Sequence, residues 1–196
     1  NGNRVAVVGA GMTKFVRRAQ ETAKELSWEA AHLALESCEM TLDDIDAVVI
    51  ATPFKSHFEL ATMMMQAGKH IFVEKPLVSQ LSDIETLKQL QKEKNVTVMV
   101  GHTFLFNSAV KYVKNLIDAG DLGDIRYIYS QRLNLGRIRS DINALWNFAP
   151  HDISIIQYWL NEAEPVSVPA NGLDYIQEDI YDVVFLNLIY PDKIMA

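Results

Sequence analysis

The sequence is poor in cysteine and has no long apolar segment. Its single cysteine, Cys38, excludes an internal disulfide, and we therefore expect a reducing, cytoplasmic setting. No apolar run reaches the roughly 18 residues that a membrane span needs. Asn1–Arg4 leads straight into a strand pattern, so we expect no secretory leader. With 49% hydrophobic and 22% charged residues, the composition is that of an ordinary soluble globular protein.

Positive charge and metal-ligand spacings are scarce too. The formal net charge is −7, and basic clusters such as Arg17-Arg18 are short. This balance argues against nucleic acid or an anionic membrane as the main partner. The five histidines and the acidic residues show no H-x-x-E-H, H-E-x-x-H or C-x-x-C spacing, so we predict no metal site.

Glycine is missing where a dinucleotide fingerprint needs it. Arg4–Val8 predicts a strand, and Gly9 and Gly11 follow as candidate cofactor-binding residues, because a glycine turn lets backbone N–H groups approach a pyrophosphate. The third glycine of G-x-G-x-x-G is replaced by Lys14. The acidic residue expected about 20 residues on falls inside a predicted helix with an apolar stripe from Ala23 to Cys38. A plain tight turn and a phosphate cradle both remain open.

The most informative stretch is HIFVEKPL at His70–Leu77. Three β-formers run into a Glu-Lys-Pro corner, as a buried parallel strand does where it meets a site. Pro76 lacks an N–H and disfavours helix at Lys75, so strand pairing should stop there. Lys75 would then lie at the carboxyl end of a sheet strand, where open α/β sheets bind ligands.

The motifs around this stretch resemble the glucose–fructose oxidoreductase and inositol dehydrogenase family (Gfo/Idh/MocA). The matching text is ATPxxxH at Ala51–His57, AGKHIFVEKPL at Ala67–Leu77 and VGHTFLFN at Val100–Asn107. The likeness continues through LIDAGDLGDIRYI and LWNFAPHDISIIQYWL, so it covers about residues 46–196. It implies NAD(P)-dependent hydride transfer at a hydroxyl of a sugar, nucleotide sugar or polyol.

The resemblance also implies which residues act. Lys75 would contact the substrate hydroxyl and the nicotinamide ribose as a proton shuttle, with His151 as its partner. His151 follows Pro150 at a predicted helix start, where capping its own helix is an equally good interpretation. Asn147 stands where relatives often have Asp, and an amide cannot share a proton with the histidine. The further implied residues are Thr52, Pro53, His57 and Glu74 for the cofactor, and His102, Arg132, Asn134, Asn147 and Asp152 for the substrate.

The first segment resembles a different family. RVAVVGAGMTKF, a helix and TLDDIDAVVI, over about residues 4–50, are similar to the start of thiolases. Thiolase chemistry needs a nucleophilic cysteine with a histidine and a second cysteine far downstream, and none follows here. Cys38 lies on the apolar stripe and is predicted to be a small core residue. Only about 35 residues separate the glycine turn from the next strand, so one strand and its acidic ribose ligand have no counterpart.

We therefore predict an α/β fold: a reduced Rossmann-like parallel sheet followed by the beginning of an α+β substrate domain. The expected domains are residues 1–106, dinucleotide-binding in type, with a thiolase-like part to residue 50 and a dehydrogenase-like part from 51, and residues 107–196. The expected elements are helices at 57–67, 82–94, 109–119 and after Pro150, and strands at 46–51, 71–73, 96–100, 125–130 and 179–195.

Two functional hypotheses follow. The first is an NAD(P)-dependent oxidoreductase that binds its cofactor weakly. Under this hypothesis, both an active and an inactive form of the chain are alternatives. The alternative is a non-catalytic chimeric or designed βα scaffold without dinucleotide binding. A natural fusion, a designed chimera and an incorrectly assembled sequence would each produce such a junction.

The end of the chain predicts self-association. In DVVFLNLIY at Asp182–Tyr190, strand spacing gives two largely apolar faces. We expect no partner strand within the chain, and an unpaired apolar edge invites another chain to add to it. The predicted outcome is a homo-oligomer formed through the open sheet, or a poorly ordered tail after about Ser167.

Overall fold

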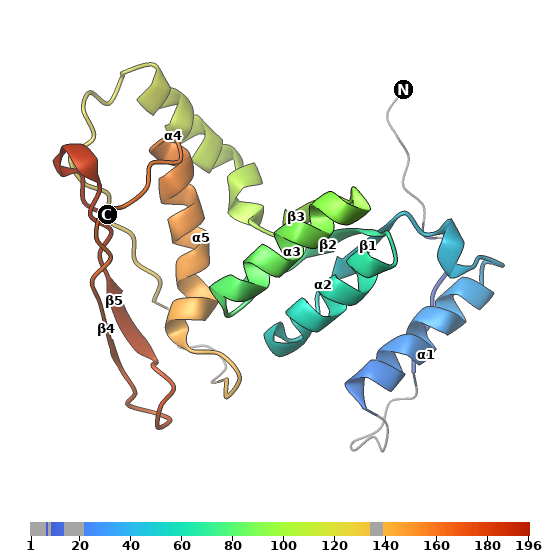
Figure 1. Ribbon diagram of the computed structural model, residues 1–196. Coiled ribbons are helices and arrows are strands. Elements are labelled where there is room, and N and C mark those ends of the chain that lie inside the picture. Colours follow the sequence, from blue (N-terminus) through green and yellow to red (C-terminus); the bar gives the residue numbers. More distant parts are fainter. Residues whose placement is uncertain (1–6, 8, 14–21, 134–138) are drawn as a thin grey trace. The chain divides into compact units, whose positions relative to one another are not determined.

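The computed structural model describes residues 7, 9–13, 22–133 and 139–196. The chain divides into two compact units, residues 1–48 and residues 49–196. Apart from Val7, the strand predicted at Arg4–Val8 lies outside the described residues. Figure 1 shows the order of the elements along the chain.

The first unit is built on helix α1 (Ala23–Glu36), as the apolar stripe predicts. Thr22 caps its N-terminus in a capping box: the Thr22 side chain accepts from the backbone N–H of Glu25, and the Glu25 carboxylate accepts from the N–H of Thr22 at 2.7 Å. A 3₁₀ turn at Leu42–Asp44 follows and leads to the first strand.

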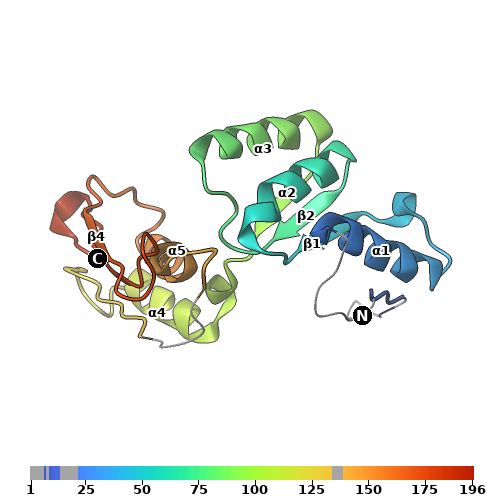
Figure 2. The same ribbon diagram turned by 90° about the horizontal axis from the view of Figure 1, so that it is seen from below.

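A three-stranded sheet starts at the boundary of the two units, since its first strand spans residues 47–50. Its order is β1 (Ala47–Ile50), β2 (His70–Val73) and β3 (Val98–Val100), and β2 and β3 are parallel with Ile71 opposite Val98. Helices α2 (His57–Gln66) and α3 (Leu81–Lys94) pack together, and α2 also packs on β2 (Figure 2). This arrangement is a parallel sheet covered by helices, and the predicted α/β class is confirmed.

The apolar residues of HIFVEKPL explain why β2 is central. Ile71 and Val73 are buried, and Ala61 and Met65 of α2 are buried as well. Successive positions on a strand point to opposite faces, so Ile71 and Val73 share one face, and that face of β2 is buried in the core. The strand ends at Val73, immediately before Glu74 and Lys75, and the Lys75–Pro76 peptide bond is cis.

The remainder of this unit combines two helices with an antiparallel pair of strands. Helix α4 (Ser108–Asp118) contacts α5 (Ala144–Trp159), and β4 (Ala170–Leu173) pairs with β5 (Val183–Leu186). Ile156 of α5 forms a buried cluster with Leu188 and Tyr190. A hydrogen bond joins the two helices, because the Trp159 indole N–H donates to the Val110 carbonyl at 3.0 Å.

Two sequence predictions in this part are wrong. The last helix does not begin after Pro150; it begins at Ala144, because the Asn143 side chain caps it by accepting from the backbone N–H of Trp146, and Pro150 lies inside the helix. Residues 125–130 do not form a strand either. Tyr127 makes a single isolated bridge with Met195, and Ile128 donates to the Met195 carbonyl at 2.9 Å.

The prediction that Asp182–Tyr190 lacks a partner strand within the chain is also wrong. Its partner β4 comes earlier in the chain, and the end of the chain returns so that Leu188 and Ala196 exchange two backbone hydrogen bonds. The two-face alternation itself agrees with the structure: Leu188 and Tyr190 are buried, whereas Val183, Phe185 and Ile189 are exposed. Residues 182–190 therefore pair with β4 along one edge, and one of their two faces is buried.

Among the described residues, no helix is long and apolar enough to cross a membrane. The predicted boundary between residues 106 and 107 stays a prediction, because β3 and the 3₁₀ turn at Thr103–Phe106 run directly into α4.

Candidate functional site

Three neighbouring strands deliver polar residues to one edge of the sheet. Backbone bonds from Glu74 N to Ile50 O, 2.9 Å, and from Gly101 N to Val73 O, 2.8 Å, align the strand ends. The residues that follow the strands are Thr52 after β1, Glu74 and Lys75 after β2, and His102 after β3. The carboxyl edge of such a sheet is where α/β proteins bind ligands, so these side chains form the candidate site.

Lys75 is at the centre of this edge. Its Nζ donates a hydrogen bond to the backbone carbonyl of Asn147 in α5 at 2.7 Å. A cavity of about 210 Å³ lies beside it, with walls from the β1 and β2 ends, α5 and the segment before α5. Partial burial lowers the pKa of Lys75, the carboxylate of Glu74 opposes this shift, and the positive charges of Arg139 and Arg132 add to it.

His151 faces the same region from α5. It lies one helical turn after Asn147, so the two residues share a face of the helix. The Nδ1 atom of His151 is buried without a hydrogen-bond partner among the described residues. Burial lowers the pKa of His151, Lys75 and Arg132 lower it further, and Asp152 opposes them. The imidazole is therefore neutral at neutral pH and able to accept a proton.

A chain of contacts holds Arg132 beside His151. The Arg132 guanidinium binds the Asp152 carboxylate through Nε at 2.5 Å and Nη2 at 3.1 Å. Its carbon lies 4.8 Å from the centre of the Phe104 ring, and that ring meets His151 edge-on at 4.8 Å between centroids. The ion pair with Asp152 and the contact with Phe104 together hold the Arg132 guanidinium in place.

His102 contributes a second imidazole. Its backbone N–H donates to the Val100 carbonyl at 2.8 Å, and it precedes the 3₁₀ turn at Thr103–Phe106. Its Nδ1 is buried and has no partner among the described residues, like that of His151. Burial lowers the pKa of His102, and its charge state influences that of His151. The site thus holds two neutral imidazoles with unused ring nitrogens.

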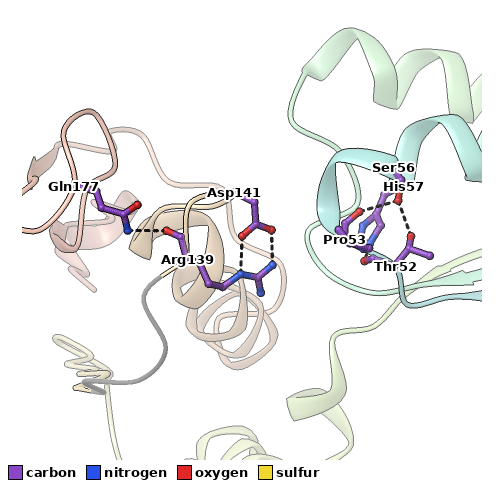
Figure 3. A network of polar contacts seen from close by, with 7 residues as sticks. All are labelled: Thr52, Pro53, Ser56, His57, Arg139, Asp141 and Gln177. Carbon is purple, nitrogen blue, oxygen red and sulfur yellow. Dashed lines mark hydrogen bonds and ion pairs between the residues drawn. The ribbon is translucent and has the colours of Figure 1, made fainter. Parts of the chain in front are cut away.

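The turn after β1 is tied to the Glu-Lys-Pro corner by His57. Its side chain is only 2% exposed, and its ring nitrogens lie 2.8 Å from the Pro76 carbonyl and 2.9 Å from the Thr52 carbonyl. Figure 3 shows Thr52, Pro53, Ser56 and His57 closing this turn, with the Ser56 hydroxyl donating to the Pro53 carbonyl at 2.8 Å. His57 therefore holds two segments of the cavity wall together.

The two glycines of the first turn are packed against α1. A Cβ on Gly9 would overlap the Ala34 carbonyl and the Cys38 sulfur, and one on Gly11 would overlap the Ala30 carbonyl. These contacts are in the C-terminal half of α1 and just beyond it. The N-terminus of the same helix is capped by Thr22 and Glu25. Close packing therefore explains why these positions are glycine.

Arg139 and Asp141 are site residues that the sequence did not single out. Arg139 lines the cavity, and its guanidinium binds Asp141 through Nε at 2.9 Å and Nη2 at 2.5 Å (Figure 3). Gln177 donates to the Arg139 carbonyl at 3.2 Å. Nothing in the spacing of RIR distinguishes Arg139 from a solvated arginine. Asn134, predicted to face the substrate, lies outside the described residues.

Within the part of the chain that the structure describes, no group of three or more histidine, cysteine or acidic side chains is placed to hold a metal ion. Cys38 is free, and its sulfur lies 3.3 Å from the carbonyls of Ala34 and Leu35.

The fold and this edge are those of a Rossmann-type α/β protein. The sequence profile described as "Oxidoreductase family, NAD-binding Rossmann fold" (GFO_IDH_MocA) matches residues 3–102. The chain belongs to this family, and the predicted family is confirmed. The match begins at residue 3, so it includes the segment that resembles thiolases.

Curated relatives extend the likeness past the Rossmann part. A 4-carboxy-2-hydroxymuconate-6-semialdehyde dehydrogenase from a Sphingobium species is 34% identical over 161 residues, which are 76% of this chain and 51% of that protein. The UDP-N-acetylglucosamine 3-dehydrogenase of Acidithiobacillus ferrooxidans is 33% identical over 154 residues, 78% of this chain and 48% of the enzyme. The chain therefore spans about half the length of these relatives.

Solved structures agree. The Acidithiobacillus enzyme superposes with a TM-score of 0.72 at 29% identity, covering 88% of this chain and 56% of that one. An inositol dehydrogenase homologue from Azotobacter vinelandii, complexed with NADH and myo-inositol, gives a TM-score of 0.72 at 20% identity over 87% of this chain and 48% of that one. At that identity the second likeness supports the fold alone.

Proposed function

We propose that this chain is part of an NAD(P)-dependent oxidoreductase that acts on a hydroxyl group of a sugar, nucleotide sugar or polyol. The observation that carries the proposal is the Lys75 ammonium, with its lowered pKa, beside the neutral imidazole of His151 at the carboxyl edge of the sheet. Membership of an oxidoreductase family and a named UDP-N-acetylglucosamine 3-dehydrogenase among the relatives support it.

The proposed chemistry is oxidation of a carbinol to a carbonyl. The carbinol carbon gives up a hydride, which the nicotinamide accepts when bound, and the hydroxyl gives up a proton to the protein. Lys75 is the proton shuttle at the hydroxyl, because its lowered pKa brings the amine closer to neutral pH. His151 takes the proton onward through its unused Nδ1, a nitrogen that would otherwise be a buried atom without a partner.

The substrate side of the site comes from α5 and β3. We infer that His102 donates to or accepts from a substrate hydroxyl, since its Nδ1 has no protein partner among the described residues. Asp152 and Arg132 are bound to each other, so they would contact the substrate together as an ion pair. Asn147 acts through its backbone carbonyl, which orients Lys75.

The cofactor residues fit one half of a dinucleotide better than the other. Thr52, Glu74 and His57 line the cavity beside Lys75, where a nicotinamide ring and its ribose would be held. Gly9 and Gly11 are packed closely against α1. At the N-terminus of that helix, the Thr22–Glu25 capping box uses backbone N–H groups and places a carboxylate where a pyrophosphate would need free donors. We therefore propose that NAD or NADP binds weakly.

A second candidate is favoured by the same observation. If no pyrophosphate binds against the first unit, the chain is a non-catalytic βα scaffold. Residues 1–48 cluster as a unit of their own, close to the junction inferred at residues 46–50. Cofactor binding distinguishes the two candidates.

The deciding experiment is a dehydrogenase assay of the chain with NAD⁺ and NADP⁺ against a panel of inositols, hexoses and UDP-sugars, followed by absorbance of the reduced nicotinamide. Turnover that disappears in Lys75→Met supports the oxidoreductase. Absence of turnover together with absence of any calorimetric signal for either dinucleotide would establish the scaffold instead.

We also propose a homo-oligomer in a cytoplasmic setting, without nucleic acid or membrane as partner. The support is the exposed face of the β4–β5 pair, where Phe185 is 69% exposed and Val183 and Ile189 are exposed beside it. The single cysteine supports the compartment.

A further inference from the structure

The cavity beside Lys75 is lined by two basic side chains, although the chain as a whole has a net charge of −7. The charged residues that line it are Glu74, Lys75 and Arg139. Arg139 is thus a second basic group where the substrate would bind.

The two arginines differ in what they can still bind. Arg132 is bound to Asp152, its face is covered by Phe104, and its side chain is 27% exposed. Arg139 lines the cavity, and its side chain is 42% exposed. Asp141 occupies only its Nε and one hydrogen of Nη2, so Nη1 keeps both of its hydrogens without a partner among the described residues. That second fork of the guanidinium is free.

The free fork is also oriented in advance. Asp141 holds the guanidinium by two hydrogen bonds, and Gln177 holds the Arg139 backbone carbonyl. Hydrogen bonds from Arg139 lower the pKa of Asp141, so this carboxylate stays ionised at neutral pH and continues to bind the Arg139 guanidinium. A planar fork fixed in this way matches the two oxygens of a carboxylate or phosphate.

Resting on the function proposed above, we propose that Arg139 binds an oxyanion of the substrate, so that the preferred substrates are hydroxylated rings carrying a carboxylate or a phosphate. In this proposal Lys75 exchanges a proton with the reacting hydroxyl, and Arg139 binds the charged group on the same molecule. Because both groups line a single cavity of about 210 Å³, one sugar-sized ring contacts both.

The test compares charged and neutral sugars on the whole chain. Binding of D-glucuronate, D-glucose 6-phosphate and D-glucose is measured by calorimetry without cofactor. We expect one charged sugar to bind at least about 10-fold more tightly than D-glucose, as a charge-assisted bidentate contact provides. The first charged sugar would identify a carboxylate, and the second a phosphate, as the group that Arg139 takes.

Paired variants isolate the fork. Arg139→Gln combined with Asp141→Asn keeps the net charge and should abolish the preference, and Arg139→Lys should retain only part of it. The matched control is Arg126→Gln with Asp124→Asn, which removes an exposed ion pair of the same two-residue spacing and should leave the preference unchanged.

Three results with the sugars would overturn the inference: no binding of either charged sugar, equal binding of charged and neutral sugars, or a preference that survives the double variant. A double variant that instead weakens NADP⁺ but not NAD⁺ would assign the fork to the cofactor and overturn it too. Failure of the oxidoreductase proposal is separate, because it would remove turnover while the binding that depends on Arg139 persisted.

Discussion

The Nζ of Lys75 and the backbone carbonyl of Asn147 are joined by a 2.7 Å hydrogen bond across 72 positions of sequence. This bond connects the carboxyl edge of the sheet to α5. The lysine is thereby oriented by a backbone atom that no side-chain substitution removes.

The first prediction concerns Lys75. Lys75→Met should lower turnover by about 10²-fold or more, the scale of a positioned acid–base group. The fold should survive, because the residue follows a strand and is only partly buried. Steady-state kinetics and circular dichroism check both parts, with Lys88→Met on exposed α3 as the control. Turnover equal to that of the parent chain would remove Lys75 from the mechanism.

The second prediction concerns the cofactor. Titration calorimetry with NAD⁺ and NADP⁺ should give dissociation constants of about 1 mM or weaker, roughly −4 kcal/mol. The physical reason is that Gly9 and Gly11 are filled by packing and Glu25 lies at the N-terminus of α1. A low-micromolar constant would contradict this account of the first unit.

The third prediction concerns the pKa of His151. Burial and the charge of Lys75 lower it, so NMR titration should give a value below the ordinary value of about 6.5. Rates that need the neutral imidazole should fall only at a correspondingly acidic pH. In Lys75→Met the pKa of His151 should rise, since one positive neighbour is lost, whereas Lys88→Met should not move it. An unchanged or lower pKa in Lys75→Met would contradict the proximity of the two groups.

The fourth prediction concerns His57. His57→Ala should lower the free energy of unfolding by about 2–4 kcal/mol, because it leaves the Thr52 and Pro76 carbonyls without the ring and opens a cavity. Urea denaturation measures the change, and Lys92→Ala on the exposed surface of α3 should stay within about 0.5 kcal/mol of the parent. A loss no larger than that of the control would mean that the ring does not hold the two segments together.

The fifth prediction concerns assembly. If the exposed face of β4 and β5 mediates self-association, Phe185→Lys should shift the chain toward monomer in light scattering, since it places a charge on an apolar face. Tyr112→Lys on α4, another exposed aromatic position, should leave the distribution unchanged. A parent chain that stays monomeric at all protein concentrations measured would contradict the oligomer proposal.

The strength of local signals decides how much of the fold the sequence predicts. Ile71, Phe72 and Val73 are strong strand formers followed by proline, so β2 and its end are predicted correctly. The start of α5 is mispredicted because Pro150 is a stronger local signal than the capping side chain of Asn143, although the cap determines the outcome. β4 is missed because Asn171 and Gly172 disfavour strands, and only pairing with β5 extends them.

The residues of the site also differ in whether local sequence signals reveal them. Lys75 and His102 follow strands that the sequence predicts, so each can be placed at the carboxyl end of a strand from the sequence. Arg139 could not be found in this way, because no local pattern marks it and the contact of its carbonyl with Gln177 joins residues 38 positions apart. Contacts of this kind leave no periodic trace in the sequence.

The sheet edge and the loop before α5 contribute to the cavity independently. Lys75 directly follows a buried strand, whose replacement would disturb the core, whereas Arg139 lies in residues 139–143, which form neither helix nor strand. Replacing residues 139–142 therefore offers a route to redirect the chain toward other substrates without rebuilding its reactive centre. Natural divergence would be free to follow the same route.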